Sequence, residues 1–230
     1  QGPVTNKANV LKVDSARSTQ FASAIAMTIS SWGGKVDPVG MHASEDYFAM
    51  TIDCIAKSKR STNWRVPVDF SSLSYPMALA ALSGEVTISN VCEIDQYQPD
   101  SVFIKILSEM GVEIGIGEVG LHVKRNEKLK SWSGNCSSFP DLVPTLAAVC
   151  AYAQGESHLK GLEVLKHKES DRFNEVLSVL NLFKVDAHGD GDSIIIKGPS
   201  LATPAPVNYI APDDHRMIMM CALLMRINNG

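Results

Sequence analysis

The chain has 230 residues, of which 45% are hydrophobic and 20% are charged, and its formal net charge is −4. This composition is typical of a globular protein with a sizeable core, in one large domain or in two of about a hundred residues each. The acidic balance argues against a general nucleic-acid-binding surface, which needs a basic surplus. Any anion-binding site is therefore expected to be local.

The cysteines and the apolar runs narrow the class of protein further. The five cysteines are widely spaced and form no C-x-x-C pair, which fits neither a disulfide framework nor a zinc site. The longest apolar runs, such as residues 217–225, are far shorter than the roughly 20 residues of a membrane helix. The first residues also lack the apolar core of a signal peptide. We expect a cytoplasmic protein with no membrane or nucleic-acid partner.

Both ends of the sequence look like cuts through a longer chain. It begins with Gln1-Gly2-Pro3 in place of an initiator methionine, and it ends with Asn228-Asn229-Gly230, a turn after an apolar helix. We therefore expect this chain to be a fragment.

Helical and strand patterns alternate along the sequence. The first part predicts a strand at 10–14, helices at 19–31 and 45–57, and a strand at 65–68. The middle predicts a helix at 75–82, a strand at 85–88, a helix at 101–110 and a hairpin from 111–114 to 121–123. The last part predicts helices at 142–152, 170–183 and 217–225, with strands at 157–159, 185–187 and 193–197 and a turn at 189–191.

An internal repeat underlies this order. The acidic residues Asp69, Asp141 and Asp214 each precede an apolar helix, and they follow one another at intervals of 72 and 73 residues. Each unit reads strand, helix, strand, helix, strand, strand. The first helix of each unit is apolar nearly all round, so we expect it to be covered on every side. The sequence therefore predicts an α/β fold of repeated βαβαββ units with buried helices inside and sheets outside.

Residues 165–172, which read LKHKESDR, concentrate cations immediately before a helical pattern. Free N–H groups and the positive end of the dipole attract anions to a helix start. Lys168 and Arg172, four residues apart, are expected on one face of the first turn. Glu169 between them is either a structural ion pair or a proton-transfer group, and spacing alone leaves both interpretations open.

Other polar residues stand at equivalent helix starts. Asp69 is expected to be an ordinary N-cap. Asp141 is either a cap or a free carboxylate, because Pro140 can form the turn without it. Arg216 at a helix start opposes the dipole, so we expect Asp213, Asp214 or a ligand anion beside it. The histidines at 42, 122, 158 and 188 lack partners at ligand spacing, so no metal site is expected.

Four motifs resemble one known family. Residues 167–172 (HKESDR) resemble the K-E-[ST]-D-R signature of the 5-enolpyruvylshikimate-3-phosphate synthases, and residues 214–217 resemble that family's D-H-R-M element. Residues 18–21 (STQF) are similar to its S-S-Q-F, and Pro140-Asp141 to its P-D before an Ala-rich helix. The motifs occur in the family's order. The resemblance implies two domains of three units each, an inside-out α/β barrel, of which this chain holds an incomplete form.

The resemblance also implies a reaction and a set of residues. The family transfers the enolpyruvyl group of phosphoenolpyruvate to the 5-hydroxyl of shikimate 3-phosphate and releases phosphate, without a metal or other cofactor. It implies that residues 1–90 belong to the shikimate-phosphate-binding domain and residues 91–230 to two units of the second domain. The implied roles are phosphate binding for Ser18, Thr19 and Ser44, bridging of the substrates by Gln20, proton acceptance by Asp141, proton delivery by Glu169 and Lys168, and anion binding by Arg172 and Arg216.

Departures from the family pattern lower the activity that we expect of this chain. Thr19 replaces the usual serine, Val164 stands where many members have asparagine, and several of the family's cations have no counterpart because the family's chain is nearly twice as long. We therefore expect this chain alone to be inactive or nearly so, and its uncovered helix faces to promote self-association of a normally monomeric fold. The alternatives are the sister UDP-N-acetylglucosamine enolpyruvyl transferase and a non-catalytic scaffold that retains the repeat.

Overall fold

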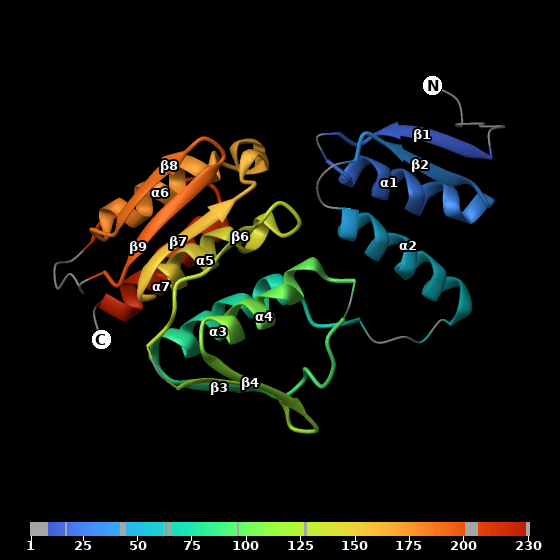
Figure 1. Cartoon of the computed structure of the whole chain (residues 1–230). Coiled ribbons are helices and arrows are strands. Elements are labelled where there is room, and N and C mark those ends of the chain that lie inside the picture. Colours follow the sequence, from blue (N-terminus) through green and yellow to red (C-terminus); the bar gives the residue numbers. More distant parts are fainter. Residues whose placement is uncertain are drawn as a thin grey trace. The chain divides into compact units, whose positions relative to one another are not determined.

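The computed structural model of the chain (Figure 1) describes residues 9–16, 18–41, 45–61, 63, 66–95, 97–126, 128–200 and 207–228. The chain divides into two compact units. Unit 1 is Gln1–Pro67 with Tyr97–Pro99, and unit 2 is Val68–Gln96 with Asp100–Gly230. Within the described residues, no helix is long and apolar enough to cross a membrane.

Unit 1 is built on a short parallel β-α-β motif. Strand β1 (Val10–Asp14) pairs in parallel with β2 (Lys35–Val39), and helix α1 (Gln20–Ile29) connects them through the one-turn 3-10 helix η1 (Ser30–Trp32). Gly33 ends this turn with φ 77°, a conformation that glycine adopts without strain. Helix α2 (Glu45–Arg60) packs against α1.

Helix α1 corrects one expectation from the sequence. It was predicted to be covered on every side, yet it buries only Ala22, Ala26 and Ile29. Phe21 and Met27 are 65% and 58% exposed. Within the described part of unit 1, α1 packs mainly on α2, β2, η1 and β1, and part of its surface is left uncovered.

The first layer of unit 2 is a three-stranded antiparallel sheet with two helices. Its strands are ordered β3 (Glu85–Ile88), β5 (Gly120–Arg125), β4 (Val112–Gly117). Helix α3 (Phe70–Ser83) packs on β3 and β5, and α4 (Val102–Glu109) packs on β4. The one-turn helix η2 (Pro99–Ser101) leads into α4.

The second layer of unit 2 is a four-stranded mixed sheet. Its order is β6 (Ser133–Asn135), β7 (Gly155–Lys160), β9 (Ser193–Gly198), β8 (Asp186–Asp190), and only the pair of β6 with β7 is parallel. Two one-turn helices and three α-helices accompany it: η3 (Pro140–Leu142), α5 (Val143–Cys150), η4 (Glu163–His167), α6 (Arg172–Leu182) and α7 (His215–Asn228).

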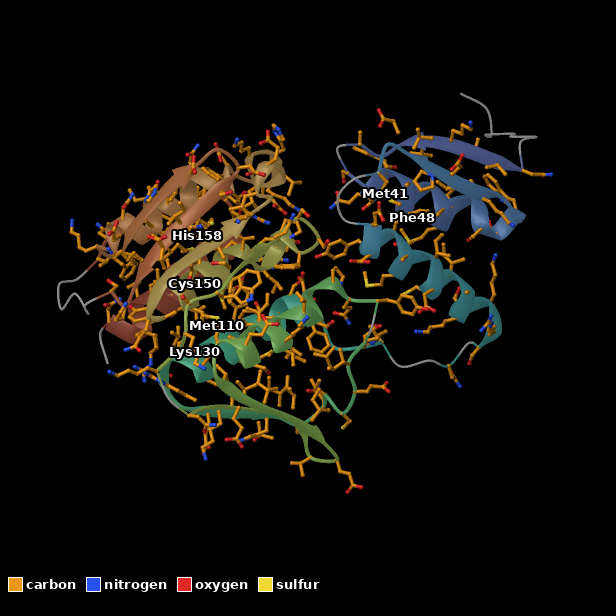
Figure 2. The ribbon with its side chains drawn as sticks, in the orientation of Figure 1. Met41, Phe48, Met110, Lys130, Cys150 and His158 are labelled. Atoms are coloured by element: carbon orange, nitrogen blue, oxygen red, sulfur yellow. The ribbon has the colours of Figure 1, made fainter. Side chains whose placement is uncertain are left out.

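The core of unit 2 lies among the apolar helices that were predicted to begin each sequence repeat. Helices α3, α5 and α7 pack against one another, and every residue of α5 is buried. Figure 2 shows the side chains of the described residues, with Met110 after α4 and Cys150 at the end of α5; both are fully buried. The two sheets lie outside these helices (Figure 1). The predicted arrangement of inner helices and outer sheets is therefore confirmed in unit 2, but α7 is not covered on every side, because Ile218, Met219 and Met225 are 50%, 39% and 38% exposed.

Several element predictions need correction. Residues 66–68 form no strand, and Arg65 lies outside the described residues. Strands β2 and β6 were not predicted, because Pro38 interrupts one pattern and Ser133–Asn135 has no apolar alternation. The compact units divide at Pro67–Val68, because helix α3 and strand β3 pack on β5 in unit 2. The domains expected from the sequence, residues 1–90 and 91–230, stay a prediction.

Candidate functional site

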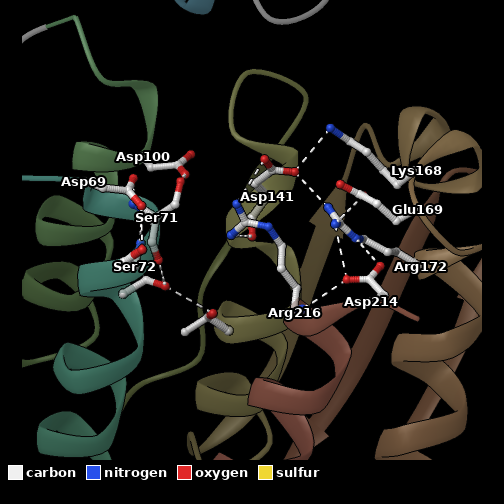
Figure 3. A network of polar contacts seen from close by, with 12 residues as sticks. Asp69, Ser71, Ser72, Asp100, Asp141, Lys168, Glu169, Arg172, Asp214 and Arg216 are labelled. Carbon is white, nitrogen blue, oxygen red and sulfur yellow. Dashed lines mark hydrogen bonds and ion pairs between the residues drawn. The ribbon is translucent and has the colours of Figure 1, made fainter. Parts of the chain in front are cut away.

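A cluster of charged side chains lies in unit 2 around the carboxylate of Asp141 (Figure 3). Asp141 Oδ1 is 2.8 Å from Arg172 Nη1 and 3.2 Å from Lys168 Nζ, and Asp141 Oδ2 is 3.2 Å from Arg216 Nη2. The Nη1 atom of Arg216 also donates to the backbone carbonyl of Asp141 at 3.2 Å. Three cations therefore converge on one carboxylate, from segments far apart in the sequence.

Arg172 is the buried centre of this cluster and is only 1% exposed. Its Nε donates to Asp214 Oδ2 at 2.7 Å, and its Nη2 atom contacts both Glu169 and Asp214 Oδ1. Asp214 is 2% exposed and also accepts from the Ser170 hydroxyl at 2.9 Å. The buried guanidinium is thus held on three sides by carboxylates, which fixes its plane.

The local sequence explains how each group is placed. Pro140 opens the one-turn helix η3 and leaves the Asp141 carboxylate free of any capping bond. Asp171 is the N-cap of α6 and accepts from the backbone N–H of Asn174 at 3.2 Å, so that α6 starts at Arg172. Asp214 accepts from the backbone N–H of Arg216 at 3.0 Å and thereby orders the start of α7.

The six charges of the cluster balance in sign. Asp141, Glu169 and Asp214 face Lys168, Arg172 and Arg216, and Glu169 is the most exposed member of the cluster. Burial tends to raise the pKa of Asp141, but Lys168, Arg216 and Arg172 outweigh it and hold that pKa below its ordinary value. The Asp141 carboxylate is therefore ionised and a weak base while all three cations contact it.

Acid is expected to destabilise unit 2 through the cluster. Burial raises the pKa of Asp214, but the bonds of its carboxylate to Arg172 and Ser170 lower that pKa by more than burial raises it. The folded-state pKa values of Asp141 and Asp214 therefore both lie below the ordinary value of 3.8. Their contribution to stability is complete above that ordinary value and is lost as the pH falls through the lowered values. We expect the free energy of unfolding, measured in urea at pH 7, 5, 4 and 3, to fall most steeply below about pH 4. A constant value between pH 5 and pH 3 would contradict this.

A second polar group lies at the start of α3, in the same view of unit 2 (Figure 3). Asp69 accepts from the backbone N–H groups of Ser71 and Ser72 at 3.0 and 3.2 Å, so it is the N-cap that the sequence predicted. The Ser71 hydroxyl bonds to the buried carboxylate of Asp100. Farther along α3, the hydroxyl of Ser74 is 3.2 Å from that of Thr145 on α5.

The remaining predicted site residues belong to unit 1. Ser18 accepts from the backbone N–H of Gln20 at 3.2 Å, Thr19 is 2% exposed, and Gln20 is exposed at the start of α1. Ser44 lies outside the described residues. The structure therefore brings together Asp141, Lys168, Glu169, Arg172 and Arg216 within unit 2, and places Ser18, Thr19 and Gln20 at one helix start in unit 1.

Sequence reasoning erred on two details of the cluster. It placed Lys168 and Arg172 on one helical turn, but Lys168 is extended and precedes α6, and the two meet through Asp141 instead. It expected Asp213, Asp214 or a ligand anion beside Arg216, whereas the negative group that pairs with the guanidinium is Asp141. Asp214 and Ser170 were missed as members, although both lie inside the motifs that carried the family resemblance.

The described residues contain no group of three or more His, Cys, Asp or Glu side chains that could hold a metal ion. His158 on β7, labelled in Figure 2, instead bonds to Glu156 at 2.7 Å.

Comparisons with known proteins agree with these motifs. Residues 38–229 match the family model of EPSP synthase (3-phosphoshikimate 1-carboxyvinyltransferase). The 3-phosphoshikimate 1-carboxyvinyltransferase of Pyrococcus abyssi is 34% identical over 93% of this chain and 54% of its own length. That of Syntrophobacter fumaroxidans is 33% identical over 92% of this chain and 55% of its own.

Solved structures give the same result for the fold. An EPSP synthase from Acinetobacter baumannii matches with a TM-score of 0.56 and 27% identity, over 69% of this chain and 39% of that chain. The enolpyruvyl transferase NikO from Streptomyces tendae matches with a TM-score of 0.51 and 17% identity, over 71% and 37%, which supports the fold alone. The chain spans about half the length of the curated relatives it matches. It belongs to the EPSP synthase family.

Proposed function

We propose that the protein takes part in the transfer of the enolpyruvyl group from phosphoenolpyruvate to the 5-hydroxyl of shikimate 3-phosphate, with release of phosphate. The supporting observation is the convergence of Lys168, Arg172 and Arg216 on Asp141 in a chain that belongs to this family. Two anionic substrates must be brought together, and a cluster of cations at helix starts provides the required attraction.

The cations have distinct tasks in this proposal. Lys168 and Arg216 are 22% and 12% exposed in their side chains, so an incoming phosphate or carboxylate can reach them. Arg172 is only 1% exposed and already contacts three carboxylates. It would bind an anion only by exchanging one of these contacts, and otherwise it orients the carboxylates around it.

Asp141 is the proposed proton acceptor for the attacking hydroxyl. Its pKa is held down by the three cations, so it is a weak base in the unliganded protein. An anionic ligand that draws Lys168 or Arg216 away would let this pKa rise. The carboxylate would then become a stronger base as the substrate binds.

Glu169 and Lys168 are the proposed groups that handle the proton at the methylene carbon of phosphoenolpyruvate. Protonation of that carbon generates oxocarbenium character at its neighbour, which nearby carboxylates stabilise. Glu169 is 55% exposed in its side chain and has Arg172 as its partner. This exposure supports the proposal, since a bound substrate would have access to the Glu169 carboxylate.

Unit 1 is proposed to contribute contacts to shikimate 3-phosphate. Ser18, Thr19 and Gln20 at the start of α1, with Ser44, would bind its phosphate and bridge the two substrates. The N-terminus of a helix favours such an anion because its first N–H groups have no acceptor within the helix.

Calorimetric titration and a phosphate-release assay test the proposal. We expect shikimate 3-phosphate and phosphoenolpyruvate to bind, and turnover by this chain alone to be more than tenfold below that of a full-length relative. Lys168→Met should weaken phosphoenolpyruvate binding by roughly tenfold or more, since a hydrogen bond to a charged group contributes about 1.5–3 kcal/mol.

The matched control is Lys166→Met, two residues away. Lys166 pairs with Glu163 at 3.3 Å on the surface and does not take part in the cluster. Its replacement should leave both affinities unchanged. No binding of either substrate by a folded chain would support a scaffold in place of an enzyme.

A further inference from the structure

Tyr75, in the second turn of α3, carries a hydroxyl that forms no hydrogen bond. The residue is 8% exposed, and its hydroxyl oxygen is the buried side-chain polar atom without a partner among the described residues. Such an atom is costly, because it gives up water and gains nothing in exchange. Phenylalanine would fill the same space without this cost, so the hydroxyl calls for an explanation.

Its polar neighbours are Thr145 and Arg216. Burial raises the pKa of Tyr75, and the positive charge of Arg216, followed by the hydroxyl of Thr145, opposes the rise. Both groups lie close to the Tyr75 hydroxyl, although neither meets hydrogen-bond geometry with it. The Thr145 hydroxyl is already 3.2 Å from Ser74. Arg216 is therefore the neighbour better able to supply a donor.

Arg216 is held loosely for an ion pair. Both of its contacts to Asp141, from Nη1 and from Nη2, measure 3.2 Å. Charge-assisted N–H···O bonds are usually about 2.7–2.9 Å. Asp141 is also shared with Lys168 and with Arg172, whose contact at 2.8 Å is the shortest of the three. A guanidinium has five N–H donors, which leaves Arg216 donors to spare.

We propose that Tyr75 is a positioning residue whose hydroxyl accepts a hydrogen bond from Arg216 when a bound anion draws that guanidinium away from Asp141. The hydroxyl is closed off from solvent, so a side chain inside unit 2 reaches it more readily than a ligand does. The bond would hold the guanidinium toward the anion and away from Asp141. The inference rests on the proposed function, because it requires an anion at the cluster.

The variant Tyr75→Phe tests the inference through its melting temperature and its affinity for phosphoenolpyruvate. A purely structural role would lower both together. The melting temperature should stay the same or rise, because no hydrogen bond of the unliganded protein is lost. Phosphoenolpyruvate, titrated by calorimetry, should bind roughly tenfold more weakly. A fall of several degrees in melting temperature would overturn the inference, since it would mean that the hydroxyl has a partner at rest.

Tyr209→Phe is the matched control. The Tyr209 hydroxyl donates to Glu175 at 3.0 Å, so the same change removes a bond that exists in the unliganded protein. We expect a lower melting temperature with unchanged affinity, the reverse of the result for Tyr75→Phe.

A double-mutant cycle with Arg216→Gln assigns the effect to Arg216. Once Arg216 is replaced, Tyr75→Phe should cause no further loss of affinity. A loss that persists would show that Tyr75 acts on the ligand without Arg216 and would overturn the inference. If the unmodified chain bound no phosphoenolpyruvate, the proposed function would fall as well, whereas equal affinities of Tyr75→Phe and the parent would overturn the inference alone.

Discussion

Replacing Arg172 by methionine is expected to lower the free energy of unfolding of unit 2 by about 3–5 kcal/mol. Methionine fills much of the volume but leaves Asp214, which is 2% exposed, without its cation. Removing one partner of a buried ion pair is costly because the remaining charge has no water to replace it. Urea unfolding followed by circular dichroism measures the change.

Arg226→Met is the matched control for this variant. Arg226 is exposed in the last turn of α7, within the same unit. Its replacement should change stability by no more than about 0.5 kcal/mol. A loss below about 1 kcal/mol for Arg172→Met would show that Asp214 finds another partner, and that Arg172 does not hold the cluster together.

Replacing Asp141 by asparagine is expected to move two affinities in opposite directions. Phosphoenolpyruvate should bind more tightly, on the order of tenfold or about 1.4 kcal/mol, because it no longer competes with a carboxylate for Lys168 and Arg216. Shikimate 3-phosphate should bind roughly tenfold or more weakly, because its hydroxyls lose a charged acceptor. Titration of each substrate separately measures both changes.

Asp171→Asn provides the control for the change of residue type. Asp171 is exposed and caps α6 beside the cluster, and asparagine caps helices equally well. Neither affinity should change in that variant. Weaker binding of both substrates by Asp141→Asn would contradict the proposal that Asp141 competes with the anion for the cations.

Membership of the cluster could be predicted only in part. The motifs indicated Asp141, Lys168, Glu169, Arg172 and Arg216, and the structure places all five together in unit 2. The pairing within the cluster did not follow from spacing, since Arg216 contacts an aspartate 75 positions away. Such a contact depends on how α5, α6 and α7 pack, and the local sequence does not predict it.

The hydrogen-bonding state of Tyr75 could not be predicted from the sequence either. In the sequence Tyr75 is one more apolar position of α3, and its unpaired hydroxyl becomes apparent only when α5 and α7 pack beside it. The hydrogen-bonding state of a buried group depends on neighbours that tertiary packing supplies.

The sequence by itself determined the order of the elements in unit 2 apart from β6, the repeat of apolar helices and the cap at Asp69, because these depend on local periodicity and on short-range hydrogen bonds. The tertiary structure decided that α3 belongs to unit 2, that α1 keeps an exposed side, and that three cations share the Asp141 carboxylate. These outcomes depend on which helix faces meet. Packing between distant segments fixes that choice, since the free energy gained by burial depends on the partner as well as on the pattern.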